Sequence, residues 1–132
     1  MDGSFYATHA CGKRWISGNT PGTVISNLVT WVFSGSAYVV PCAMAKTAIH
    51  AMTMSLAAEW GPKGVRLNAV APGPFPTENA WEKLNPIPGS SVGATQPDMV
   101  PMRRFGAMDE LRNILIFLML DECSYVNGTT IP

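Results

Sequence analysis

The sequence has one charged side chain, Lys46, in the long stretch between Trp15 and Ala58. The residues just before it, 41–45, begin an alanine-rich segment that is typical of a buried helix. Because an ammonium group is costly to desolvate without a partner, a lysine in such apolar surroundings indicates a functional contact. The alternative is a lysine whose apolar stem lies along the helix while its charge reaches water. This stretch therefore predicts a fold with an apolar helical layer in which the side chain of Lys46 points towards the interior.

The residues that follow this helix predict its end and a strand. Residues 59–64, Glu-Trp-Gly-Pro-Lys-Gly, combine glycine and proline as a helix stop. Val65 to Ala71 alternate as a strand does, and Pro72-Gly73-Pro74 ends them. A helix with an inward lysine followed by a strand and a tight turn is half of a nucleotide-binding α/β layout.

Hydrophobic periodicity predicts the remaining elements. We expect helices at residues 4–16, 41–59, 77–84 and 108–120, strands at 23–32 and 65–71 with a last short strand within 125–131, and loops at 33–38 and 86–101. Helices between successive strands imply parallel pairing. The predicted fold class is therefore α/β, with three parallel strands flanked by helices.

Composition narrows the possible partners and compartment. The 132 residues are 47% hydrophobic and 14% charged with a net charge of zero, which fits a single globular domain and disfavours nucleic acid as a partner. Glycine, proline and asparagine interrupt the uncharged stretch before it reaches the roughly 20 apolar residues of a membrane span, so we expect no membrane. Three scattered cysteines and no basic-then-apolar leader predict a reducing, cytoplasmic location.

Short runs of residues along most of the chain are similar to one family. They lie at residues 3–8, 35–41, 45–46, 55–61, 66–68, 71–78 and 104–106. In this order and spacing the chain resembles the carboxyl-terminal half of short-chain dehydrogenases/reductases, and within them the 2,4-dienoyl-CoA reductase branch. Val39-Val40-Pro41 before the Lys46 helix favours this branch over the ketoacyl reductases.

The resemblance implies a partial Rossmann-type, doubly wound parallel sheet, with residues 1–132 as the carboxyl-terminal half and the amino-terminal dinucleotide-binding half absent. It implies NADPH-dependent reduction of an unsaturated fatty acyl-CoA thioester, with NADH as a possible cofactor. Lys46 would bind the nicotinamide ribose and supply positive charge. Pro72, Gly73, Pro74 and Phe75 would line the nicotinamide, and Thr77 would approach the pyrophosphate.

The candidate catalytic residues, by the same resemblance, are Lys46, Asp2, Trp31 and Cys42. Asp2 stands where the family has a catalytic asparagine, Trp31 stands where the branch has its tyrosine fifteen residues before the lysine, and Cys42 stands where a serine precedes the lysine by four. Tryptophan offers an N–H donor and no ionisable proton. Tyr38, about two helical turns before Lys46, is the nearest phenol.

Two of these residues have alternative interpretations. The Cys42 thiol is either activated by the ammonium one helical turn away or a small packing residue. Asp2 either polarises a water or lies in a frayed terminus.

Three functions remain open at this stage. The sequence has no glycine-rich phosphate loop after a strand, so the alternatives to the reductase are a non-catalytic fragment that acts as an interaction module and a ketoacyl or enoyl thioester reductase. The strand at 23–32 would present an unpaired edge, so we expect a homo-oligomer or a partner chain to cover it.

Overall fold

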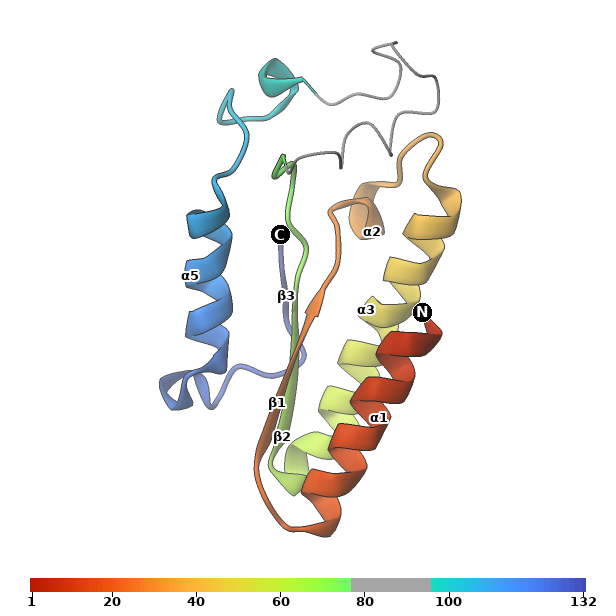
Figure 1. The fold of residues 1–132 in the computed structure, drawn as a ribbon, viewed down its shortest axis with the longest axis vertical. Coiled ribbons are helices and arrows are strands. Elements are labelled where there is room, and N and C mark those ends of the chain that lie inside the picture. Colours follow the sequence, from red (N-terminus) through yellow and green to blue (C-terminus); the bar gives the residue numbers. More distant parts are fainter. Residues whose placement is uncertain (77–95) are drawn as a thin grey trace.

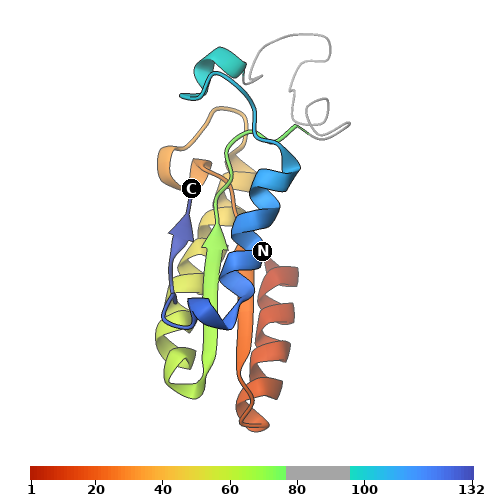
Figure 2. The same cartoon turned by 90° about the vertical axis from the view of Figure 1, so that its left-hand side faces the viewer.

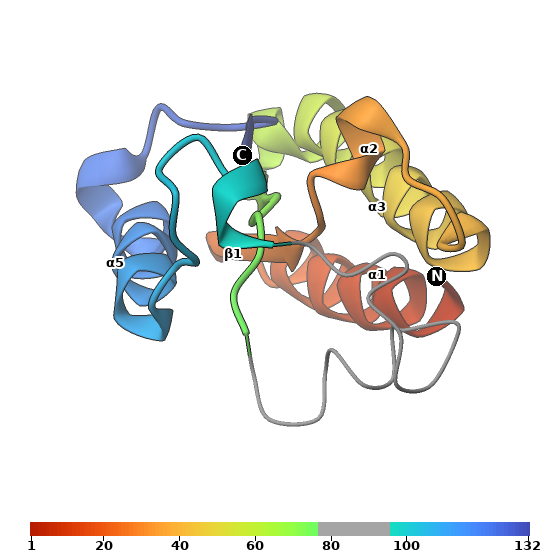
Figure 3. The same cartoon turned by 90° about the horizontal axis from the view of Figure 1, so that it is seen from above.

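The computed structural model describes residues 1–76 and 96–132 of the chain. Three strands, β1 (Gly22–Asn27), β2 (Val65–Val70) and β3 (Thr130–Ile131), form one parallel sheet in the order β1-β2-β3. Helices α1 (Asp2–Ser17) and α3 (Val40–Trp60) lie on one face, and α5 (Met108–Met119) lies on the other (Figures 1 and 3). The short helix α2 (Trp31–Ser34) and the 3-10 turns η1 (Gly61–Lys63), η2 (Pro97–Met99) and η3 (Asp121–Cys123) complete the described elements. The predicted α/β class, with three parallel strands between helices, is confirmed.

The alternation along β2 explains why both faces of the sheet are covered. Val65 and Leu67 are fully buried in the cluster that contains Trp60 of α3. Val70 points to the opposite face, where it packs with Leu118 of α5. Successive side chains of a strand point to opposite faces, so this apolar strand needs a helical layer on each side.

Helix α3 is buried along one stripe rather than all round. Ile49, Thr53, Ala57 and Trp60, spaced by three or four residues, are its buried positions. This spacing turns one face of the helix towards the sheet. Met44 near its amino-terminal end is 68% exposed, so the helix is less buried in this chain than its composition predicts.

Gly12 of α1 lets the indole of Trp60 approach the helix backbone. A Cβ atom at position 12 would lie 2.2 Å from Cζ3 of Trp60, far inside van der Waals contact. The glycine thus fixes how closely α1 packs on the end of α3.

Most predicted boundaries are within two residues of those observed, but the predicted end of the first strand is wrong. We predicted a strand over residues 23–32 and a loop over 33–38, whereas β1 ends at Asn27 and residues 31–34 form α2. Asn27 pairs with Val70, the last residue of β2, so β1 has almost no partner beyond that point. Local bonds such as Phe33 N–H to the Thr30 carbonyl (3.0 Å) satisfy the backbone there instead.

The predicted helix at 77–84 and most of the predicted loop at 86–101 lie outside the described residues.

Candidate functional site

The carboxyl ends of β1 and β2 meet at one edge of the sheet. The register pairs Asn27 with Val70, so the segments after both strands start side by side. Helix α2 and the amino-terminal end of α3 lie at this same upper end of the molecule (Figures 1 and 2). In open parallel α/β sheets, this edge is where ligands bind.

Lys46 reaches this edge from α3. Its Nζ atom donates a hydrogen bond to the backbone carbonyl oxygen of Asn27 at 2.5 Å, and the side chain is half-buried. An ammonium group has three N–H donors, and Asn27 accepts one of them. Two donors of Lys46 therefore remain for a ligand at the strand ends. Its role as a cofactor ligand stays a prediction.

The turn after β2 is narrowly restricted in conformation. Pro72 and Pro74 fix their own φ angles and have no N–H, and both are half-buried, whereas Gly73 is exposed. The Ala71 N–H donates to the Ile131 carbonyl at 2.7 Å, so the sheet ladder continues up to the start of the turn. Within the described residues, the N–H groups of Gly73 and Phe75 have no hydrogen-bond partner.

These groups suit one half of a dinucleotide. Two lysine N–H donors match the hydroxyl oxygens of a ribose, and a rigid turn with unpaired N–H groups matches a carboxamide. The residues present therefore fit the nicotinamide side of such a cofactor. Thr77, expected near the pyrophosphate, lies outside the described residues.

Trp31 lies on α2, whereas Cys42 lies on α3, the helix that carries Lys46. Trp31 is the first residue of α2 and is half-buried, and its indole N–H has no partner within the described residues. Cys42 lies in the first turn of α3, one helical turn before Lys46, and is exposed. Its interpretation as a buried packing residue is therefore wrong for this chain.

Tyr38, the phenol nearest to Lys46 in the sequence, lies outside α3. It precedes the first residue of α3, so helical spacing does not relate it to Lys46, as the sequence interpretation assumed. Its backbone is in the left-handed region (φ 62°), and its side chain is 69% exposed.

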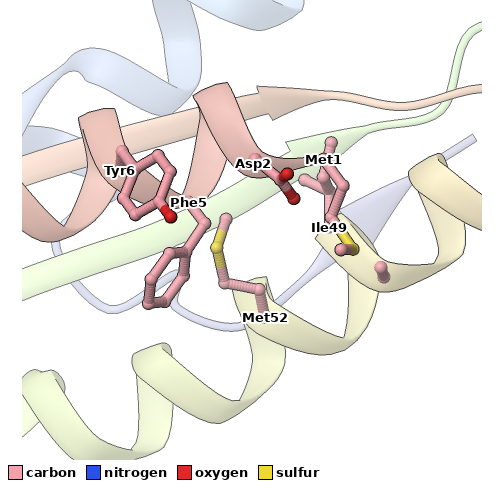
Figure 4. A pocket seen from close by; sticks show the side chains of 7 residues that line it. Met1, Asp2, Phe5, Tyr6, Ile49 and Met52 are labelled. Atoms are coloured by element: carbon pink, nitrogen blue, oxygen red, sulfur yellow. The ribbon is translucent and has the colours of Figure 1, made fainter.

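Asp2 is helical rather than frayed, and it lines an apolar pocket. It lies in the first turn of α1, where Met1, Phe5 and Tyr6 face Ala48, Ile49 and Met52 of α3 across a cavity of about 200 Å³ (Figure 4). Its carboxylate forms no hydrogen bond or ion pair with any residue in the described parts of the chain. The structure thus brings Lys46 and the Pro72–Phe75 turn to one edge, and links Asp2 to neither.

Sequence reasoning missed two partners of these groups. The carbonyl of Asn27 holds Lys46, and the N–H of Gly106 donates to the carbonyl of Pro74 at 3.1 Å. Both are backbone groups, which carry no sequence signal of their own. In the sequence, Arg104-Phe105-Gly106 is only one of the runs that carry the family resemblance.

The described residues contain no group of three or more histidine, cysteine or acidic side chains arranged to hold a metal ion. Among the described helices, none combines the length and the apolar character that a membrane crossing requires.

Comparison with known proteins identifies the family. The sequence model described as enoyl-(acyl carrier protein) reductase matches residues 1–132. The chain is 35% identical over 131 residues to a probable 2,4-dienoyl-CoA reductase of Caenorhabditis elegans, covering 99% of the chain and 42% of that protein. It is also 35% identical over 132 residues to a probable 2,4-dienoyl-CoA reductase of Bacillus subtilis, covering 99% of the chain and 51% of that protein.

Solved structures agree in fold. A short-chain dehydrogenase from Bacillus anthracis superposes with a TM-score of 0.82 at 34% identity, covering 99% of this chain and 48% of that one. A 3-oxoacyl-[acyl-carrier protein] reductase with bound NAD from Brucella melitensis gives a TM-score of 0.82 at 29% identity, covering 99% and 46%. The chain belongs to the short-chain dehydrogenase/reductase family. It is similar to 2,4-dienoyl-CoA reductases and spans about half the length of the relatives it matches.

Proposed function

We propose that this chain supplies the nicotinamide half of the cofactor site in an NADPH-dependent reductase of unsaturated fatty acyl-CoA thioesters. The observation that carries the proposal is the position of Lys46, whose amine lies on the Asn27 carbonyl at the carboxyl edge of the sheet. The similarity to probable 2,4-dienoyl-CoA reductases supports the substrate class. NADH in place of NADPH, or a ketoacyl or enoyl thioester as substrate, is an alternative that activity measurements distinguish.

Each candidate residue has a defined task in this proposal. Lys46 binds the ribose hydroxyls with its two remaining donors and holds a positive charge near the reacting carbons. The turn of Pro72, Gly73, Pro74 and Phe75 orients the nicotinamide through its backbone. The cofactor, when bound, supplies the hydride. Thr77 remains a proposed contact to the pyrophosphate.

Trp31 limits how far this chain completes the reaction. Its indole N–H donates one hydrogen bond to a developing oxyanion but releases no proton at neutral pH. Cys42 is exposed beside Lys46, and Asp2 has no link to the lysine, so neither replaces a phenol in the described structure. These features favour the rival proposal, a non-catalytic interaction module.

The β1 edge supports the expectation of a partner. Among the described strands β1 pairs only with β2, so its second edge is open. Five of its six residues are half-buried. An open edge with apolar side chains tends to pair with another strand. We propose that a second polypeptide segment, in another chain or a second copy, covers it. Light scattering after size-exclusion chromatography checks this proposal. A monomer that unfolds cooperatively contradicts it.

We also propose a reducing, cytoplasmic setting. Support comes from Cys11, Cys42 and Cys123, which form no disulfide.

Tryptophan fluorescence tests the cofactor site directly. The chain has four tryptophans, and one of them, Trp31, begins α2 at this edge, so bound NADPH should accept energy from tryptophan emission in a saturable titration. Lys46→Ala should weaken binding by roughly 10- to 100-fold, because hydrogen bonds to a charged group contribute about 1.5–3 kcal/mol. Lys63→Ala is the matched control, since Lys63 is an exposed residue of η1, just before the amino end of β2.

The outcomes separate the two proposals. Saturable transfer that Lys46→Ala weakens and Lys63→Ala preserves supports the cofactor half-site. No transfer at millimolar NADPH or NADH refutes it for this chain and favours the interaction module. If binding is present, Trp31→Tyr tests whether a phenol restores thioester reduction.

A further inference from the structure

The two described segments on either side of residues 77–95 contact each other at the turn after β2. Phe75 lies at the end of the turn after β2, and Gly106 lies two residues before α5. The Gly106 N–H donates to the carbonyl of Pro74 at 3.1 Å. Both Phe75 and Gly106 are half-buried. The turn that follows β2 is thus attached to the start of α5.

The Phe75 ring occupies the space that a side chain at position 106 would need. A Cβ atom built on Gly106 would lie 2.3 Å from Cε1, 2.4 Å from Cζ and 2.7 Å from Cδ1 of Phe75. Ordinary contacts of this kind are 3.4–4 Å, so the ring and a side chain at position 106 exclude each other. The φ angle of Gly106 is not in the left-handed region, so space rather than backbone conformation requires glycine here.

The residues on either side of Gly106 are bound to the start of α5. Arg104 forms two hydrogen bonds of 2.7 Å with the Glu110 carboxylate, and the same carboxylate accepts the Ala107 N–H at 2.8 Å. These contacts fix the residues on both sides of Gly106 to the first turn of α5. Helix α5 is anchored in turn by Leu118, which is fully buried.

We propose that Gly106 is a positioning residue that sets the nicotinamide-binding turn through Phe75. The inference rests on the proposed function of that turn. With glycine at 106, the Phe75 ring packs on the backbone and the Pro74 carbonyl keeps its hydrogen bond. With a side chain at 106 the ring must shift, and we expect the turn that carries it to move relative to Lys46.

The test compares Gly106→Ala with Gly3→Ala. Gly3 lies on α1, and no atom lies within 4 Å of a Cβ built there, so its substitution should change nothing in the turn. The chain is labelled with 15N-glycine, which gives at most twelve amide signals, including those of Gly73 and Gly106. The first readout is the Gly73 amide shift without cofactor, and the second is the NADPH affinity from tryptophan energy transfer.

We expect Gly106→Ala to move the Gly73 amide signal and to weaken NADPH binding by roughly tenfold, as overpacking of a defined contact does. In a Phe75→Ala background the same substitution should have little further effect on either readout, because the ring it displaces is gone. An unmoved Gly73 signal, or an equal loss of affinity in both backgrounds, overturns the proposal.

Two results keep this inference separate from the proposed function. If the wild-type chain binds no NADPH, the proposed function fails, while the Gly73 signal still decides whether Gly106 sets the turn. If Gly106→Ala does not fold, Phe75→Ala alone serves: the ring contact predicts a shift of the Gly106 amide signal, and an unshifted signal overturns the contact.

Discussion

Asn68 is the polar side chain whose removal should most directly test how the sheet is joined to the carboxyl-terminal segment. It lies in the middle of β2 and is fully buried. Its Nδ2 donates to the Val126 carbonyl at 2.8 Å, and its Oδ1 accepts the Thr129 N–H at 3.1 Å. Asn68→Leu keeps the branched shape of the side chain and removes both bonds.

The magnitude follows from what each partner has left. The Val126 carbonyl still accepts a hydrogen bond from Arg66 at 3.2 Å, so losing its bond from Asn68 costs little stability. The Thr129 N–H, which belongs to a half-buried residue, has no other partner in the described structure, and leaving a fully buried donor unpaired costs about 1–3 kcal/mol. The added apolar surface of leucine offsets part of this. We therefore expect a loss of about 2 kcal/mol in the free energy of unfolding.

Urea unfolding followed by tryptophan fluorescence measures this change, because Trp60 is buried against β2. With a slope of about 2 kcal/mol per molar urea, the midpoint should fall by about 1 M. The control is Asn113→Leu, the same substitution at an exposed position of α5, which should change stability by less than about 0.5 kcal/mol. Equal midpoints for Asn68→Leu and the wild type would refute the argument that these bonds join the segment to the sheet.

Two further stability predictions follow from other contacts. The hydrogen bond from Arg104 lowers the pKa of Glu110 from its ordinary 4.5 to about 2, so its contribution to stability is complete above about pH 4.5 and is lost as the pH falls towards 2. Urea midpoints of Glu110→Gln and the wild type should accordingly differ at pH 7 and converge near pH 2; a constant difference would contradict this. Gly12→Ala should lower the free energy of unfolding by about 1–3 kcal/mol, because the new Cβ would overlap the Trp60 ring, whereas Gly3→Ala has open space and should cause no loss. Equal unfolding curves for the two glycine variants would show that α1 shifts freely on α3.

Local sequence determined the helices, the alternation of β2 and the fold class. Helices α1, α3 and α5 begin and end within two residues of their predicted positions, because periodic apolar residues and glycine or proline stops act over a few residues. The family was also visible in the sequence, since its short runs keep their order and spacing. Lys46 is a candidate from the sequence for a different reason, because it is a lone charge in an apolar stretch.

Only the tertiary structure decided where β1 ends, what holds Lys46 and why residue 106 is glycine. The β-branched residues up to Val32 favour a strand, but β2 offers no partner beyond the Asn27–Val70 pair, so the chain forms α2 instead. The Asn27 carbonyl and the Phe75 ring are far in sequence from Lys46 and Gly106, respectively, and meet them only after the sheet and helices pack. Such contacts depend on pairing between distant segments, which no local pattern of residues encodes.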